Sequence, residues 1–138
     1  MALICDTGVL YGAMDAADDD HERCATLLAT AAQPIVVPSP VMVEVDWLAG
    51  RRLEPTAFGA LLADVEDGVV TVADLVPTDY MRIRTLCAQY ADLPLGFVDA
   101  AVAAVAERLS ERAIATLDHR HFGVVRPRHT AAFELLPA

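Results

Sequence analysis

Four acidic residues stand beside or within apolar segments of the chain. Asp6 directly follows the apolar run that begins the sequence, and Asp118 ends the apolar run "AIATL". Asp99 lies near the start of an alanine-rich segment, and Glu44 lies within an apolar one. Hard divalent cations such as Mg²⁺ prefer carboxylate oxygens, and bound ions can stabilise the attacking and leaving oxygens of a phosphodiester. Brought together, the four acids indicate a metal-dependent phosphodiesterase.

Each of these carboxylates also has a structural explanation that involves no chemistry. Asp6 suits the N-cap of a helix, Asp99 suits the positive end of a helix dipole, and Asp118 suits a turn. Glu44 is the hardest to explain in this way, because an unpaired carboxylate within an apolar helix costs several kcal/mol. Solvation at the edge of its helix is the alternative. Asp46, two residues further on, is expected on a different and exposed face.

The elements that must position these acids follow from the pattern of the chain. Apolar strands alternate with helices, which favours a parallel sheet covered on both faces, an α/β fold built as a single three-layer α/β/α sandwich. In such a sheet, Asp6 and Asp118 emerge at the same carboxyl edge, where open α/β sheets bind ligands. Strands are expected at 2–5, 35–37, 68–75 and 113–118, with one or two edge strands in 124–137. Helices are expected at 9–14, 22–32, 40–50 (capped by Ser39 and ended by Gly50), 55–66, 77–90 and 97–109.

Composition narrows the possible functions. The 138-residue chain is 55% hydrophobic and 22% charged, which is typical of one globular domain. Its formal net charge of −10 argues against general nucleic-acid binding, and it suits a protein that holds divalent cations or pairs with a basic partner. All ten positive residues are arginine, and the absence of lysine excludes P-loop and Schiff-base chemistry.

Cysteine usage and hydropathy predict the compartment. Cys5, Cys24 and Cys87 lie far apart and form no CxxC pair, so we expect small buried side chains in a reducing environment. No apolar run approaches the roughly 20 residues that span a bilayer, and no membrane association is expected. The N-terminus lacks the basic segment of a signal peptide, which predicts a cytoplasmic location.

The spacing of the acidic segments resembles that of a known family. "ICDTGVLYGAM", "SPVMVEVDWL", "LPLGFVDAAVAAVAE" and "ATLDHRHFGVVRPRH" stand in the order and context of the PIN-domain nucleases. More closely, the chain resembles the toxin ribonucleases of VapBC toxin–antitoxin pairs. The resemblance covers essentially the whole chain. It implies a single PIN domain over residues 1–138, with a parallel five-stranded sheet and Mg²⁺ or Mn²⁺ at its carboxyl edge.

The resemblance also implies roles for particular residues. It matches the family's acidic quartet to four positions here, which would be the catalytic residues Asp6, Glu44, Asp99 and Asp118. Asp6, Asp99 and Asp118 would bind metal, and Glu44 would share a second ion with Asp118 or orient the attacking water. The hydroxyl residues Thr7 and Thr116 would support a ligand or a water.

The chain departs from the family pattern at three positions. Gly8 stands where a second hydroxyl residue is frequent, and Val98 precedes Asp99 where alanine is frequent. His121 takes a position where a further acid is common. The first departure bears on water positioning and the last on the number of bound ions, but none removes an acid of the quartet.

Arginines near Asp118 are candidates for contact with RNA. Arg120, Arg126 and Arg128 cluster in sequence around it, and the alternative is a solvated segment that pairs with the protein's own acids. Trp47 is expected in the core, with stacking on a base as the alternative, and Tyr11 is a second stacking candidate.

The sequence therefore predicts a Mg²⁺- or Mn²⁺-dependent endoribonuclease toxin that leaves 5′-phosphate and 3′-hydroxyl ends. The resemblance implies a structured RNA such as tRNA or rRNA as substrate, a VapB-type antitoxin as partner, and a homodimer. Two alternatives stay open. One is a non-catalytic metal-binding PIN scaffold that acts by binding a partner or RNA, and the other is a PIN nuclease of RNA processing without toxicity.

Overall fold

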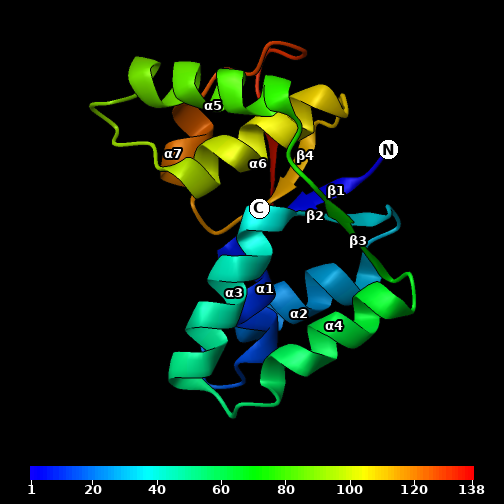
Figure 1. Ribbon diagram of the computed structural model, residues 1–138. Coiled ribbons are helices and arrows are strands. Elements are labelled where there is room, and N and C mark those ends of the chain that lie inside the picture. Colours follow the sequence, from blue (N-terminus) through cyan, green and yellow to red (C-terminus); the bar gives the residue numbers. More distant parts are fainter.

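Five short parallel strands form the central sheet of the computed structural model, which describes residues 1–138 (Figure 1). The strands lie in the order β3-β2-β1-β4-β5. The chain therefore builds outward from β1 in one direction and then returns to add β4 and β5 on the other side. This reversal falls between β1 and β4, and the crevice at such a switch point is where open α/β sheets bind ligands. The strands are β1 (Leu3–Cys5), β2 (Ile35–Pro38), β3 (Val70–Ala73), β4 (Ala113–Ala115) and β5 (Glu134–Leu136).

Helices cover both faces of this sheet. Four of them lie on one side and three on the other, so the predicted α/β/α sandwich with a parallel five-stranded sheet is confirmed (Figure 1). The strands β1, β2 and β4 are buried along their whole length, which explains their continuous apolar sequences. The first group is α1 (Thr7–Met14), α2 (His21–Thr30), α3 (Ser39–Arg52) and α4 (Ala57–Glu66), and the second is α5 (Pro77–Gln89), α6 (Phe97–Arg108) and α7 (His119–Val124). None of these helices has the length and apolar character needed to cross a membrane.

Two details of α3 differ from the sequence prediction. The helix continues past Gly50 to Arg52, because a glycine without a left-handed conformation weakens a helix by only about 1 kcal/mol. The buried Ala49 and the cationic end at Arg51 and Arg52 favour its continuation. Ser39 is also not the cap: it is the first helical residue, and its side chain makes no capping hydrogen bond.

The segment after Asp118 forms the short helix α7, where the sequence suggested only a turn. The Asp118 carboxylate caps this helix by accepting a hydrogen bond from the backbone N–H of His121. Phe122 is fully buried and packs edge-on against Phe133, with ring centroids 6.5 Å apart. Tertiary burial of one aromatic side chain thus stabilises a helix that is too short to show periodicity in the sequence. The tail then contributes a single edge strand, β5.

Candidate active site

The four acids that the sequence singled out line one hollow at the carboxyl edge of the sheet. Asp6 follows β1, and Asp118 follows β4 three residues after its end. Asp99 lies in the first turn of α6, and Glu44 in the second turn of α3. The hollow has a volume of about 510 Å³ and is lined by Asp6, Thr7, Gly8, Glu44, Leu48, Asp99, Leu117 and Asp118. Four separate elements therefore bring their carboxylates to one place.

Asp6 is the most deeply buried of these acids, with 6% of its surface exposed. Its Oδ1 accepts a hydrogen bond of 2.8 Å from the Thr7 backbone N–H, and its Oδ2 accepts one of 2.9 Å from the Thr116 hydroxyl. Burial raises the pKa of Asp6 to about 6, and the charges of Asp99 and Glu44 act in the same direction, while the two hydrogen bonds oppose them. The fold thus holds a carboxylate where its charged form is unfavourable without a counter-ion.

Asp99 is a second carboxylate with a raised pKa. Burial raises its pKa, the negative charge of Asp118 raises it further, and His121 acts against both. Thr116 connects the two strand ends, because its hydroxyl donates to Asp6 and accepts from the Asp118 backbone N–H at 3.0 Å. One hydroxyl therefore holds the Asp6 carboxylate and the backbone of Asp118 in a fixed relation.

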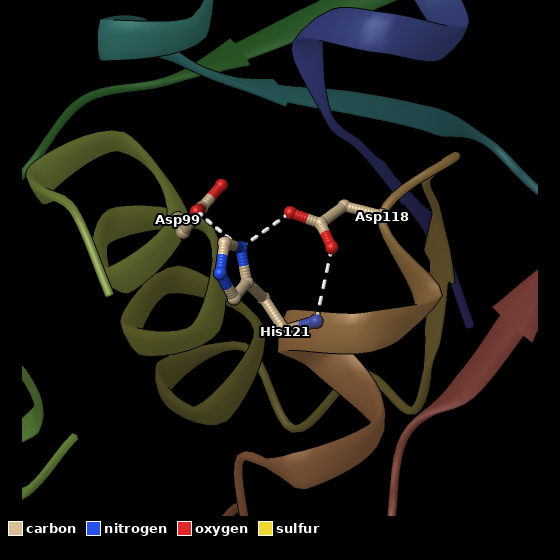
Figure 2. A group of neighbouring side chains, drawn as sticks. All are labelled: Asp99, Asp118 and His121. Carbon is tan, nitrogen blue, oxygen red and sulfur yellow. Dashed lines mark hydrogen bonds and ion pairs between the residues drawn. The ribbon is translucent and has the colours of Figure 1, made fainter. Parts of the chain in front are cut away.

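His121 lies between two of the acids (Figure 2). Its Nδ1 is 2.5 Å from Asp118 Oδ2 and 3.5 Å from Asp99 Oδ2. Its Nε2 lies 3.1 Å from the carbonyl oxygen of Leu93. The sequence indicated His121 as a departure from the family pattern and as one of the residues around Asp118 that could contact phosphate, and its place within the acidic group was not predicted. The available signal was its position three residues after Asp118, one turn along a short helix.

The residues of the hollow fit a divalent cation. The donors that line the hollow are carboxylate oxygens, and the His121 imidazole lies beside them. One atom each from Asp99, Asp118 and His121 lie within 4.8 Å of one another, and the predicted ligand Asp6 does not belong to this close group. The Thr7 hydroxyl oxygen is buried and has no hydrogen-bond partner. Since an unpartnered buried hydroxyl costs about 1–3 kcal/mol, this oxygen suits a site completed by a bound group such as a metal-held water.

The three arginines near Asp118 are exposed, and none of them forms an ion pair with an acid. Arg120 lies on α7 itself, and Arg126 donates a hydrogen bond of 2.9 Å to the carbonyl of Gly123. Arg128 follows on the exposed segment before β5. These guanidinium groups are therefore free of protein carboxylates, contrary to the alternative of internal pairing.

The burial of the two aromatic candidates for base stacking differs from the prediction: Trp47 is exposed and Tyr11 is buried. Trp47, expected in the core, is 58% exposed on α3 and carries the Arg51 guanidinium 4.7 Å from its ring centre. Trp47 lies on the outward face of α3, and the apolar residues beside it in the sequence gave no sign of this exposure. Tyr11 is buried, and its hydroxyl donates to Asp15, so it cannot stack on a base.

A parallel α/β/α sandwich with four acids at its switch point is the architecture of a PIN domain, and the PIN-domain family model matches residues 3–126. The chain belongs to the PIN-domain family. Within it, the chain is similar to Ribonuclease VapC26 of Mycobacterium tuberculosis, with 31% identity over 98% of this chain and 100% of that relative.

Solved structures share this fold. The crystal structure of VapC20 of Mycobacterium tuberculosis, described as a toxin that cleaves the sarcin–ricin loop, superposes with a TM-score of 0.76 at 21% identity, covering 82% of this chain and 87% of that one. VapBC2 from Rickettsia felis, solved with a DNA fragment from its promoter, gives a TM-score of 0.70 at 16% identity, covering 98% of both chains.

Proposed function

We propose that this protein is a metal-dependent endoribonuclease toxin of a VapBC-type pair. The observation that carries the proposal is the hollow at the switch point, where four acids converge and two of them have raised pKa values. Such a group holds excess negative charge that a divalent cation neutralises. The similarity to a ribonuclease over the full length of the chain supports RNA as the substrate.

In this proposal Mg²⁺ or Mn²⁺ is held by Asp6, Asp99 and Asp118. The bound ion supplies a Lewis acid and lowers the pKa of a water molecule. Thr116 and the Thr7 backbone N–H each occupy one lone pair of the Asp6 carboxylate and fix its orientation. Asp6 also lines the hollow, so its remaining lone pairs would be available to a cation there.

Glu44 is the acid best placed to act on the attacking water. Its carboxylate lines the hollow, is half-buried and makes no hydrogen bond or ion pair with the rest of the chain. It is therefore free to accept a hydrogen bond from a water and orient its oxygen toward the phosphorus atom. The new oxygen–phosphorus bond forms as the bond to the 3′-oxygen breaks, which leaves a 5′-phosphate and a 3′-hydroxyl.

Expression in a bacterial host tests the toxin part of the proposal. Induction of the wild-type chain is expected to arrest growth and to produce discrete RNA fragments, whereas the Asp99→Asn chain leaves growth unchanged. Growth and fragments are measured after induction at matched protein levels. A wild-type chain that cuts RNA in vitro without slowing growth would favour an RNA-processing nuclease, and arrest without any fragments would favour a non-catalytic scaffold.

The exposed arginines that follow Asp118 in the sequence, Arg120, Arg126 and Arg128, are proposed to bind RNA phosphates. The Arg120→Ala/Arg128→Ala variant is expected to bind RNA several-fold more weakly, with the salt dependence of binding reduced by about one unit per arginine removed. Fluorescence anisotropy of a labelled RNA, measured over a salt series in the Asp99→Asn background, reports both quantities. Arg23→Ala is the matched control, because Arg23 is exposed on α2 and pairs with Asp20. Equal affinity and equal salt slope for all variants would refute the assignment.

A VapB-type antitoxin is the proposed partner, and the similarity in fold to a toxin–antitoxin complex from Klebsiella pneumoniae supports this proposal. The net charge of −10 suits a basic antitoxin tail whose arginine enters the acidic hollow.

A homodimer is proposed through the apolar groove beside Glu44, where Val43, Trp47, Tyr80 and Phe97 are exposed. The mass in solution, measured by light scattering, distinguishes this dimer from a monomer.

A further inference from the structure

His121 has the arrangement of a metal ligand that is oriented by a second group. A backbone carbonyl can only accept a hydrogen bond, so the contact of 3.1 Å between His121 Nε2 and the Leu93 oxygen places a proton on Nε2. Asp118 Oδ2 is likewise only an acceptor, so in the metal-free protein Nδ1 donates to it at 2.5 Å, and a cation bound between the two atoms would take the place of that proton. Metal-binding histidines in proteins almost always donate their other N–H in this way, which fixes both the tautomer and the ring orientation.

Nδ1 faces two of the acids that are proposed to hold the cation. Nδ1 lies 2.5 Å from Asp118 Oδ2 and 3.5 Å from Asp99 Oδ2, and Figure 2 shows the ring edge directed between the two carboxylates. Adjacent ligands of an octahedral ion at about 2.1 Å lie about 3 Å apart, between these two separations. Only small side-chain shifts are needed to place one ion against all three donors.

The backbone of α7 keeps this geometry in place. Asp118 Oδ1 accepts a hydrogen bond of 2.9 Å from the His121 backbone N–H, so the carboxylate and the imidazole are held by the same turn. The Asp118 backbone N–H is in turn fixed by the Thr116 hydroxyl. The Asp118 carboxylate cannot turn away without breaking the cap of the helix, and the His121 ring cannot turn away without losing its contact with the Leu93 carbonyl.

We propose that His121 Nδ1 is a direct ligand of the divalent cation at this site, in the position where an additional acid is common in the family. The proposal rests on the proposed function, since it concerns the same ion. Imidazole nitrogen suits transition metals, whereas Mg²⁺ prefers oxygen. The site is therefore selective for Mn²⁺ over Mg²⁺ to a greater degree than an all-carboxylate site.

Pulsed electron paramagnetic resonance of the Mn²⁺-loaded protein tests the proposal without relying on activity. The wild-type spectrum is expected to show the nitrogen coupling of a directly bound imidazole, and His121→Asn is expected to lose it. By calorimetry, the same variant is expected to bind Mn²⁺ at least about tenfold more weakly, with a smaller loss for Mg²⁺. His119→Asn is the matched control, because His119 is on the same helix and its Nε2 contacts the Thr116 carbonyl instead.

The outcomes separate this inference from the proposed function. Mn²⁺ binding without nitrogen coupling would overturn the role of His121 and leave the metal-dependent nuclease in place. Coupling that persists in His121→Asn would also overturn it, since another nitrogen would then be the ligand. No Mn²⁺ binding by the wild-type chain would overturn both. Thermal denaturation in EDTA confirms that each variant is folded.

Discussion

The Asp99→Asn variant is expected to cleave RNA at least about a thousand-fold more slowly than the wild-type chain. Asp99 lies in the first turn of α6, lines the hollow and faces His121 Nδ1 at 3.5 Å. Asparagine keeps the size of the side chain but removes the negative charge that would hold a cation. A catalytic metal stabilises the transition state by several kcal/mol, and about 4 kcal/mol corresponds to a thousand-fold change in rate. Initial rates of cleavage of a defined RNA in Mn²⁺ measure this loss.

Asp46→Asn is the matched control for this prediction. Asp46 is exposed on α3, two residues from Glu44, and does not line the hollow. This control removes one negative charge from the same region and is expected to cleave at the wild-type rate. An Asp99→Asn chain that retains a tenth or more of the wild-type rate would show that Asp99 does not hold a catalytic ion.

The Asp6→Asn variant is expected to be more stable than the wild-type chain at pH 7.5 in the absence of metal, by about 2 kcal/mol. The folded pKa of Asp6, about 6, lies above its ordinary value of 3.8. Protonated Asp6 therefore contributes stability that is fully present below about pH 3.8 and is lost as the pH rises through about 6. At about 1.4 kcal/mol per pKa unit the whole loss is about 3 kcal/mol, and imperfect hydrogen bonding of the amide offsets part of the gain.

Urea denaturation in EDTA at pH 7.5 and pH 4.5 measures this difference in the free energy of unfolding. The advantage of Asp6→Asn is expected to shrink at the lower pH, where the wild-type carboxyl is largely protonated. Addition of Mn²⁺ at pH 7.5 is expected to stabilise the wild-type chain and not the variant, because only the wild type binds the ion tightly. A variant that is less stable than wild type at pH 7.5 in EDTA would contradict the account of Asp6.

The positions of the acids at the sheet edge follow from local sequence and one rule of topology. Short apolar runs before Asp6 and Asp118 predict buried parallel strands, and parallel strands deliver their following residues to one edge. The direction of the strands alone therefore determines the edge of the sheet at which Asp6 and Asp118 emerge. For this reason the fold class and the meeting of Asp6 and Asp118 were within reach of sequence reasoning, whereas Glu44 and Asp99 lie on helices and were matched to the site by the resemblance to the PIN-domain family.

Features that depend on contacts distant in sequence were not within its reach. The orientation of His121 depends on the carbonyl of Leu93, which is 28 residues away. Helix α7 depends on the burial of Phe122 against Phe133, which belongs to the segment before the last strand. The exposure of Trp47 depends on which face of α3 the rest of the chain covers. In each case the local pattern was compatible with two arrangements, and tertiary packing selected one of them.

Metal-dependent cleavage of RNA is tested most simply with a purified total-RNA pool and the wild-type protein in Mn²⁺, with and without excess EDTA. We expect discrete fragments that carry 5′-phosphate ends, their loss in EDTA, and their return when Mn²⁺ is restored. Cleavage that EDTA leaves unchanged, or an absence of fragments from protein shown by calorimetry to bind Mn²⁺, would contradict a metal-dependent endoribonuclease.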